Sequence, residues 1–347
     1  MTHKLSICIP TLNRGNYIGI TLESITCQME ETIEIVIVDG GSTDNTQQVV
    51  NSYQCSFQNI RYIRNEASGK QPSNEGFDRD CNSAVELADG EYCWLMTDDD
   101  ILMPGAIRKI LSETEKGYQL IVASIEVRDK TLTELLLPRR PDILHDRIYK
   151  PHEWNHFAVK IVFHLTFVGA VIINRKLWLS RSREKYFGSG FIHIGVIFCE
   201  PIKQDILIIA DPQVSLRYGN GQWMNRAFQI WMLDWPNLIW SLPELSDKSK
   251  KNICSLEPWK EIRNLLYFRA LGLYTLVEFH KLWSNDTLSL ARIVAYMISI
   301  LPKSWANFLV IIYQSLFKKS PLVALQDLRY NQNCSTIARL WLRLLGF

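Results

Sequence analysis

Short apolar runs alternate with helical patterns through the first 125 residues, and this alternation constrains the fold more than any other feature. Apolar runs rich in β-branched residues with helices between them are typical of βαβ units, which build a largely parallel sheet. The predicted fold class is therefore α/β, with helices flanking the sheet. We expect strands at Leu5–Ile9, Ile33–Val38, Ile60–Arg64, Tyr92–Met96 and Gln119–Ser124, with helices near 16–29, 43–53, 78–88 and 104–116.

The remainder of the chain carries different patterns. Residues 126–160 hold three prolines and several charges, which predicts a long excursion over the sheet. The run Ile161–Asn174 looks like a buried strand pair, and Ile206–Ile209 looks like a further short strand. Beyond residue 222 the sequence shows long helical stretches rich in Trp, Leu and Arg. We therefore expect an α/β domain over residues 1–221 and a helical region over residues 222–347.

Composition excludes several classes of protein. With 47% hydrophobic residues, 21% charged residues and 11 Trp, the chain has the composition of a globular protein. Its formal net charge is only +2, so no protein-wide basic field favours nucleic acid as a partner. The eight cysteines form no CxxC pair, and the apolar run Leu5–Ile9 is too short for a signal peptide. These features predict reduced thiols and a cytoplasmic protein.

Polar residues follow each of the first four predicted strands. Ligands of such sheets bind at the carboxyl ends of the strands, so these residues are candidates for a common site. Their amide, hydroxyl, guanidinium and carboxylate groups suit a nucleotide diphosphate. In chain order they are Pro10-Thr11-Leu12-Asn13-Arg14, Asp39-Gly40-Gly41-Ser42-Thr43-Asp44, Arg64-Asn65 with Asn74-Glu75-Gly76-Phe77-Asp78, and Thr97-Asp98-Asp99-Asp100.

The Asp98-Asp99-Asp100 triplet is the most informative of these groups. Three adjacent carboxylates after a buried run repel one another and raise one another's pKa unless a cation lies between them. A hard divalent ion, Mg²⁺ or Mn²⁺, accepts carboxylate oxygens and fills its other positions with water and diphosphate oxygens. The alternative is a solvated acidic turn before a helix that begins near Pro104. Taken alone, the triplet is compatible with both interpretations.

The order of the motifs resembles glycosyltransferase family 2, whose catalytic domain has the GT-A fold. The resemblance covers residues 1–115 strongly and the following stretch weakly, and its details are most similar to the abequosyltransferase-type enzymes of bacterial O-antigen assembly. It implies an inverting hexosyl- or deoxyhexosyltransferase with a pyrimidine-diphosphate sugar donor and a polyprenyl-linked glycan acceptor. The segments that carry it are Cys-Ile-Pro-Thr-Leu-Asn-Arg, Ile-Val-Asp-Gly-Gly-Ser-Thr-Asp-Asn-Thr, Asn74–Asn82, Ala-Asp-Gly-Glu-Tyr, the Asp triplet and Phe-Gly-Ser-Gly-Phe-Ile-His.

The resemblance also implies roles for individual residues. Pro10, Thr11 and Arg14 correspond to the wall of the nucleotide pocket. Asp39 corresponds to the residue that contacts the pyrimidine or the ribose. The residues expected beside the donor are Asn74, Gly76, Asp78 and Asn82.

The sequence departs from the family pattern at two places. An insertion around Gly69–Pro72 lengthens the loop before the third motif. In addition, Thr97 stands at the first Asp position of the commoner Asp-x-Asp-Asp form. We assign the metal to Asp98 and Asp100, with Asp99 turned toward the ribose or the donor sugar as a catalytic residue.

An inverting transfer needs a general base on the face opposite the leaving nucleotide. His193 is the strongest candidate in the corresponding stretch, because an unperturbed imidazole has a pKa of about 6.5. The alternative is a hydrogen-bonded core histidine, with Glu200 and Asp205 as fallback bases. Arg217 falls where the family often has a basic residue that neutralises the departing diphosphate, the alternative being a surface arginine at a turn.

Two other classes of function compete with glycosyl transfer. His152-Glu153-Trp154-Asn155-His156 matches H-E-x-x-H, in which two histidines on one helix bind Zn²⁺ and the glutamate activates water. That interpretation also needs a third ligand in a suitable place. A glycosyltransferase-like binding subunit without activity is the other alternative, because a fold does not establish a reaction.

The C-terminal region contains two apolar stretches, Ile293–Leu301 and Trp305–Ile312. Each is shorter than the about 20 residues that a membrane-spanning helix needs, so we expect two short helices. We predict that they attach the protein peripherally to the inner face of the cell membrane, where it would meet a lipid-linked acceptor. A buried hairpin, or an interface in a homo-oligomer, is the alternative. The residues that favour a headgroup-layer helix are Arg292, Lys303, Trp305, Tyr313, Phe317, Lys318 and Lys319.

Overall fold

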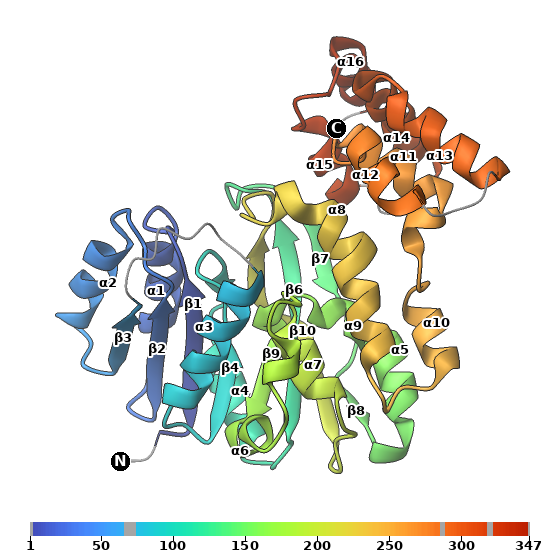
Figure 1. Ribbon diagram of the computed structural model, residues 1–347. Coiled ribbons are helices and arrows are strands. Elements are labelled where there is room, and N and C mark those ends of the chain that lie inside the picture. Colours follow the sequence, from blue (N-terminus) through green and yellow to red (C-terminus); the bar gives the residue numbers. More distant parts are fainter. Residues whose placement is uncertain (1–2, 66–73, 285–288, 318–321, 346–347) are drawn as a thin grey trace. The chain divides into compact units, whose positions relative to one another are not determined.

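The computed structural model describes residues 3–65, 74–284, 289–317 and 322–345 (Figure 1). The chain divides into two compact units. The first unit comprises Met1–Arg217 with Leu238–Ile253, and the second comprises Tyr218–Asn237 with Cys254–Phe347. The first unit therefore ends at Arg217, before the expected boundary at residue 222. One segment of the expected helical region, Leu238–Ile253, also belongs to the first unit.

Within the described residues, a ten-stranded sheet forms the centre of the first unit. It contains β1 (Leu5–Thr11), β2 (Ile33–Asp39), β3 (Ile60–Arg64), β4 (Tyr92–Leu95), β5 (Ile101–Leu102), β6 (Leu120–Arg128), β7 (Leu135–Arg140), β8 (Arg147–Tyr149), β9 (Val171–Asn174) and β10 (Ile206–Arg217). The order is β3-β2-β1-β4-β9-β6-β10-β5, with β7 beside β6 and β8 beside β10. Strands β1 to β4 are parallel, β9 is antiparallel to β4 and β6, and β10 is parallel to β6. Strands β6 and β10 therefore point in the same direction as β1.

Helices pack around this sheet, which explains why β1 and β2 are buried along their whole length. Strands covered on both faces are continuous apolar runs instead of alternating patterns. Helix α3 contacts both β1 and β2. The helices of the first unit are α1 (Ile18–Thr26), α2 (Thr46–Gln54), α3 (Asn74–Leu87), α4 (Ala106–Thr114), α5 (Trp154–Leu165), α6 (Arg175–Leu179), α7 (Ile192–Phe198) and α10 (Asp247–Ile253).

The structure confirms the predicted strands of the first 125 residues, but the predicted strand pair at Ile161–Asn174 is wrong. The first part of that run belongs to α5, and only β9 is a strand. Helix α5 buries Phe157, Ile161 and Leu165 at helical spacing, while Phe163 points outward. Its β-branched residues imitate a strand, so tertiary burial decides the element.

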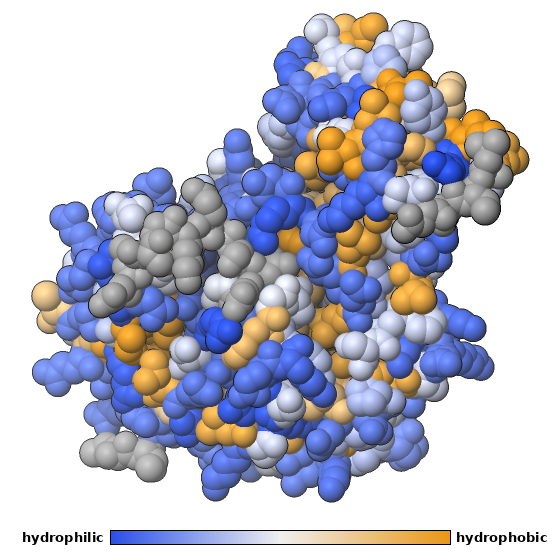
Figure 2. Space-filling model, viewed as in Figure 1, coloured by the Kyte–Doolittle hydropathy of each residue, from blue (hydrophilic) through white to orange (hydrophobic). Residues whose placement is uncertain are grey.

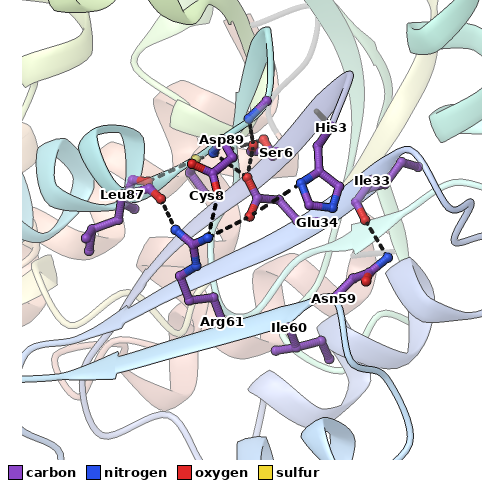
Figure 3. A network of polar contacts seen from close by, with 12 residues as sticks. His3, Ser6, Cys8, Ile33, Glu34, Asn59, Ile60, Arg61, Leu87 and Asp89 are labelled. Atoms are coloured by element: carbon purple, nitrogen blue, oxygen red, sulfur yellow. Dashed lines mark hydrogen bonds and ion pairs between the residues drawn. The ribbon is translucent and has the colours of Figure 1, made fainter. Parts of the chain in front are cut away.

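A network of polar groups around the buried Glu34 ties the amino ends of the strands together (Figure 3). Glu34 of β2 accepts hydrogen bonds from the Ser6 hydroxyl at 2.6 Å and from the Asp89 amide at 2.5 Å. Arg61 of β3 lies 3.9 Å from Glu34 and forms an ion pair with Asp89 at 2.5 Å. This network links β1, β2, β3 and the segment before β4, and leaves the carboxyl ends of the strands to carry the site.

The second unit is helical. It contains α8 (Ala227–Gln229), the first part of α9 (Trp235–Ser241), α11 (Ile262–Ala270), α12 (Leu276–Trp283), α13 (Leu290–Ile300), α14 (Lys303–Phe317), α15 (Leu322–Arg329) and α16 (Thr336–Leu344). Two apolar clusters hold these helices together, and α11 contributes to both, through Phe268 to one and through Ala270 to the other. Among the described residues no single helix could cross a membrane, although α13 and α14, bent by 109°, have the required length and composition as a pair.

Candidate functional site

The carboxyl ends of the parallel strands bring the predicted motifs to one edge of the sheet. Thr11 ends β1, Asp39 ends β2 and Arg217 ends β10, while the Asp triplet follows β4. Pro10 and Thr11 are both buried, opposite Val38 and Asp39 of the neighbouring strand. The side-chain contacts at this edge show what each residue does there.

Arg14 holds two members of the Asp triplet. Its Nε donates to Asp98 Oδ1 at 3.0 Å, and its guanidinium also forms an ion pair with the Asp99 carboxylate. The Arg14 amide donates to Thr46 Oγ1 at 2.8 Å, which fixes the turn between β1 and α1. Buried guanidinium–carboxylate pairs of this kind fix geometry strongly.

The third member, Asp100, is bound to the end of β10. Its Oδ1 accepts from the Arg217 amide at 2.6 Å, and its Oδ2 accepts from the Thr97 hydroxyl. Thr21 of α1 donates to the Asp100 carbonyl at 2.8 Å. Asp100 therefore joins the turn after β4 to β10, with both carboxylate oxygens used by donors of the protein.

The triplet is electrostatically unbalanced. Burial, together with the charge of Asp99, raises the pKa of Asp98 to about 6 although Arg14 opposes the shift. Burial and Asp99 also raise the pKa of Asp100 well above its usual value. Raised pKa values mean that a further positive charge at this edge would stabilise the ionised triplet.

Arg217 supplies part of the positive charge at this edge, and one of its N–H groups has no acceptor in the part of the chain that the structure describes. Its Nε donates to the Asp99 carbonyl at 2.8 Å, and one terminal nitrogen donates to the Lys130 carbonyl at 3.0 Å. The other terminal nitrogen is buried and has no hydrogen-bond partner among the described residues. A buried N–H without an acceptor is costly, so this position suits an anionic ligand.

Tyr17 is a site residue that the sequence analysis missed. The ring centroid of Tyr17 lies 4.9 Å from the Arg14 guanidinium carbon and 5.3 Å from that of Arg217. An aromatic face attracts a guanidinium, so the ring holds both cations beside the triplet. No short motif marks a tyrosine at the start of a helix, and only the fold brings it between two arginines that lie far apart in sequence.

Asp39 is predicted to contact the donor base or ribose, but in the structure both of its carboxylate oxygens accept hydrogen bonds from other residues of the protein. Its Oδ1 accepts from the Gly41 amide at 3.0 Å and from the amide and hydroxyl of Ser42, both at 2.7 Å. Its Oδ2 accepts from the Tyr62 hydroxyl at 2.5 Å and lies 3.9 Å from Arg64 Nε. The side chain is fully buried and shapes the turn after β2.

Two of the predicted donor residues on α3, Asp78 and Asn82, also face the protein. Asp78 accepts from the Gly190 amide at 2.9 Å and from the Ile192 amide at 3.0 Å, so it fixes the segment that enters α7. Burial raises the pKa of Asp78 to about 7. Asn82 accepts from the Trp178 indole at 3.1 Å. Gly76 lies in the first turn of α3, while the Asn74 side chain and the Gly69–Pro72 insertion lie outside the described residues.

His193 lies in the core near the start of α7, with 1% of its surface exposed. Its Nε2 lies 2.8 Å from the Leu165 carbonyl, so Nε2 carries the proton and Nδ1 carries the lone pair. Nδ1 is buried and has no partner among the described residues. Burial lowers the pKa of His193 to about 4. His193 is thus a hydrogen-bonded core histidine, the alternative to a general base, but its Nδ1 has no hydrogen-bond donor within the described part of the chain.

The fallback bases lie in the segment between α7 and β10. Asp205 directly precedes β10 and forms an ion pair with Lys150 at 2.6 Å. Because β10 runs parallel to β1, its amino end lies at the edge opposite the triplet. Glu200 belongs to the same connecting segment and is exposed. Topology therefore separates Asp205 from the Asp triplet.

The H-E-x-x-H segment does not form a zinc site in this fold. Pro151, His152 and Glu153 form a short 3₁₀ turn, and α5 begins only at Trp154, so the two histidines do not share one helix. Glu153 accepts from the Lys150 amide at 2.9 Å and caps the turn. Among the described residues, no three His, Cys, Asp or Glu side chains converge on a common point.

Comparison with known proteins agrees with this architecture. S. aureus TarS, residues 1–349, superposes with a TM-score of 0.53 over 98% of this chain and 91% of that structure, at 15% identity. The same protein with UDP-GlcNAc gives a TM-score of 0.51. At this identity the similarity shows the fold alone, and it confirms the predicted GT-A fold.

Curated relatives share more sequence. The abequosyltransferase RfbV of Salmonella typhimurium is 31% identical over 204 residues, which is 56% of this chain and 60% of RfbV. The GalNAc(5)-diNAcBac-PP-undecaprenol beta-1,3-glucosyltransferase of Campylobacter jejuni is 31% identical over 115 residues, or 33% of this chain and 36% of that enzyme. The chain thus spans between about a third and three fifths of these relatives. Residues 6–178 match the family described as glycosyl transferase family 2, and the chain belongs to that family.

Proposed function

We propose that the protein transfers a sugar from a nucleoside-diphosphate donor to a glycan acceptor with inversion at the anomeric carbon. The observation that carries the proposal is the buried terminal nitrogen of Arg217, which has no acceptor among the described residues although it lies beside the Asp triplet. A diphosphate supplies that acceptor. The same group explains why the sheet edge gathers two arginines and three carboxylates around Tyr17.

The carboxylate oxygens of the triplet suit Mg²⁺ or Mn²⁺ only if the nucleotide sugar supplies further oxygen ligands. Carboxylate oxygens are the hard ligands that these ions prefer. Burial and the charge of Asp99 raise the pKa values of Asp98 and Asp100, so added positive charge would stabilise the ionised carboxylates. The described side chains alone do not make a cage. We propose Asp98 as one ligand and Asp100 as the other through a remaining lone pair, with Asp99 directed toward the ribose or the sugar. The ion would neutralise the departing diphosphate.

The named relatives support a lipid-linked acceptor. The Campylobacter jejuni relative is named for an undecaprenol-linked glycan, and RfbV is named for the transfer of abequose. We therefore propose a polyprenyl-linked intermediate of a bacterial surface polysaccharide as the acceptor. The donor sugar is proposed only as a hexose or deoxyhexose on a pyrimidine nucleotide.

The test of this function is the release of nucleoside diphosphate from a panel of nucleotide sugars, with Mn²⁺, in the presence and absence of polyprenyl-linked glycans. We expect one donor to be consumed faster when its acceptor is present. If every donor stays intact although nucleoside diphosphates bind, the protein is a binding subunit. If no nucleotide binds, the assignment of the sheet edge is wrong.

A membrane surface is the proposed place of this reaction. Helices α13 and α14 are apolar on their buried faces and also expose large apolar side chains. Hydrophobic residues, coloured orange in Figure 2, are visible on the surface of the helical second unit. From residue 290 to the end the chain has seven Lys and Arg and a single acidic residue, Asp327. Asp327 accepts hydrogen bonds from Tyr218 and Tyr267, both at 2.9 Å. Positive charge beside exposed apolar helices favours an anionic lipid surface.

We predict that the full chain floats with phosphatidylglycerol-rich vesicles and that Trp305→Ser with Leu309→Ser releases it. Both side chains lie on one face of α14 and are 68% and 51% exposed, so the double variant removes apolar contact without changing the core. The matched control is Leu144→Ser with Ile148→Ser in the first unit, whose side chains are also exposed. Lys318 and Lys319 lie outside the described residues, so Lys318→Glu with Lys319→Glu tests their charge separately.

Flotation and sedimentation distinguish the possible outcomes. If the native protein stays with the soluble fraction, the membrane proposal is wrong. If it is a dimer that the Trp305 and Leu309 changes dissociate, the surface joins two copies of the chain. Equal flotation of native and changed proteins would place the attachment elsewhere.

A further inference from the structure

Two carboxyl groups lie together where β2 ends, and only one of them is fully used. Both carboxylate oxygens of Asp39 accept hydrogen bonds, one from the turn after β2 and the other from Tyr62. Asp80, from α3, faces the same turn: a Cβ atom added to Gly40 would fall 2.7 Å from Asp80 Oδ2. The missing side chain of Gly40 is what allows Asp80 to approach this closely.

Asp80 retains capacity to bind a ligand. Its Oδ1 accepts from Asn65 Nδ2 at 2.9 Å, whereas no described residue donates to its Oδ2. The side chain is 9% exposed, unlike the fully buried Asp39. Burial raises the pKa of Asp80 to about 7, and the negative charge of Asp39 contributes to the same shift. A buried carboxylate beside a like charge is stabilised by an additional hydrogen-bond donor.

Asn65 offers a second group beside it. The Asn65 amide donates to the Asp39 carbonyl at 2.8 Å, which fixes the residue at the end of β3. Its side-chain amide has two hydrogens, and the contact with Asp80 uses one of them. Asn65 is exposed, so the second hydrogen can reach a ligand. Asp80 and Asn65 together present an acceptor next to a donor.

We propose that Asp80 and Asn65 select the base of the donor nucleotide, and that the base they select is uracil or thymine. This inference rests on the proposed function and names the residues that determine its donor class. Uracil carries an N3–H donor next to the O4 acceptor, which matches Asp80 Oδ2 and the second Asn65 hydrogen. Cytosine carries an acceptor at N3 and a donor at N4, so both contacts become repulsive. Asp39 then acts as a positioning residue that shapes the turn.

The experiment compares the dissociation constants of UDP and CDP, measured by calorimetry on the full chain with Mg²⁺. We expect the native protein to bind UDP more tightly, because a site built around hydrogen bonds rejects an analogue that leaves them unpaired. Asp80→Asn replaces the acceptor by an amide, which can donate to cytosine N3. We expect it to lower the preference for UDP over CDP by about tenfold or more. The matched control is Asp211→Asn, whose side chain is 87% exposed.

A ratio of two affinities in one protein separates selectivity from general damage to the site. If Asp80→Asn does not fold, Asn65→Ala is the second variant, because Asn65 is exposed and the same ratio must fall. A native protein that prefers CDP, or an unchanged ratio in both variants, overturns the inference while leaving the proposed function intact. If neither nucleotide binds the native protein, the proposed function itself has failed.

Discussion

Asp98→Asn is expected to lower sugar transfer by about 10²- to 10³-fold, the range found when one electrostatic contact to a developing charge is lost. The change keeps the shape of the side chain but removes the charge that would hold the cation and the charge that pairs with Arg14 at 3.0 Å. The measurement is the rate of nucleoside diphosphate release with saturating donor and Mn²⁺. Chelation of the native protein should lower the rate to the same extent.

The controls for this change test both charge and fold. Asp211→Asn alters the same chemical group on an exposed part of β10 and should leave the rate unchanged. Thermal unfolding of Asp98→Asn should resemble that of the native protein, because burial opposes the charge that the variant loses. Full transfer in the presence of chelator would refute the metal dependence.

The second large effect is expected for His193→Gln. We propose that Nδ1 of His193, which has no partner among the described residues, accepts the acceptor proton. The variant should then lose about 10²- to 10⁴-fold in turnover while its affinity for UDP is kept. Since burial lowers the pKa of His193 to about 4, the ring is neutral and able to accept a proton throughout the neutral range. Its protonation should therefore reduce the rate only as the pH falls toward 4, so a rate loss centred near pH 6.5 would not belong to His193.

A second measurement decides whether His193 is only structural. Gln keeps a donor for the Leu165 carbonyl, so a merely structural role predicts near-native turnover in this variant. His193→Ala removes both functions and should be less stable than His193→Gln. An unchanged turnover in His193→Gln would remove His193 from the mechanism.

The rule that ligands bind at the carboxyl ends of parallel strands explains what could be predicted from the sequence. It brings Arg14, the Asp triplet and Arg217 to one edge without knowledge of their contacts. The match between apolar runs and strands fails at α5, where β-branched residues occupy a helix whose buried residues recur at helical spacing. The GT-A fold followed from the resemblance, and the structural comparisons confirm it.

The roles of single side chains could not be predicted in the same way, because they depend on which donors reach them. Asp39 and Asp78 look like ligand-binding residues in the sequence, but backbone amides at the turns they face use their oxygens. Tyr17 and Asp80 carry no motif of their own. They become part of the site only because Arg217 and Gly40 lie beside them in the folded chain.

The pairing of β10 with β6 has a consequence for insertions and deletions. Ile209 pairs with Ala123, yet Arg217 pairs with Arg128, so β10 passes through three more residues than β6 over the same distance. Side chains alternate between the faces of a strand, so an odd number of extra residues decides which face Arg217 occupies. If one residue of this irregular stretch were deleted, Arg217 would keep its face only if the bulge shortened enough to preserve the pairing with Arg128. Homologues should therefore preserve the length of this strand as strictly as its arginine.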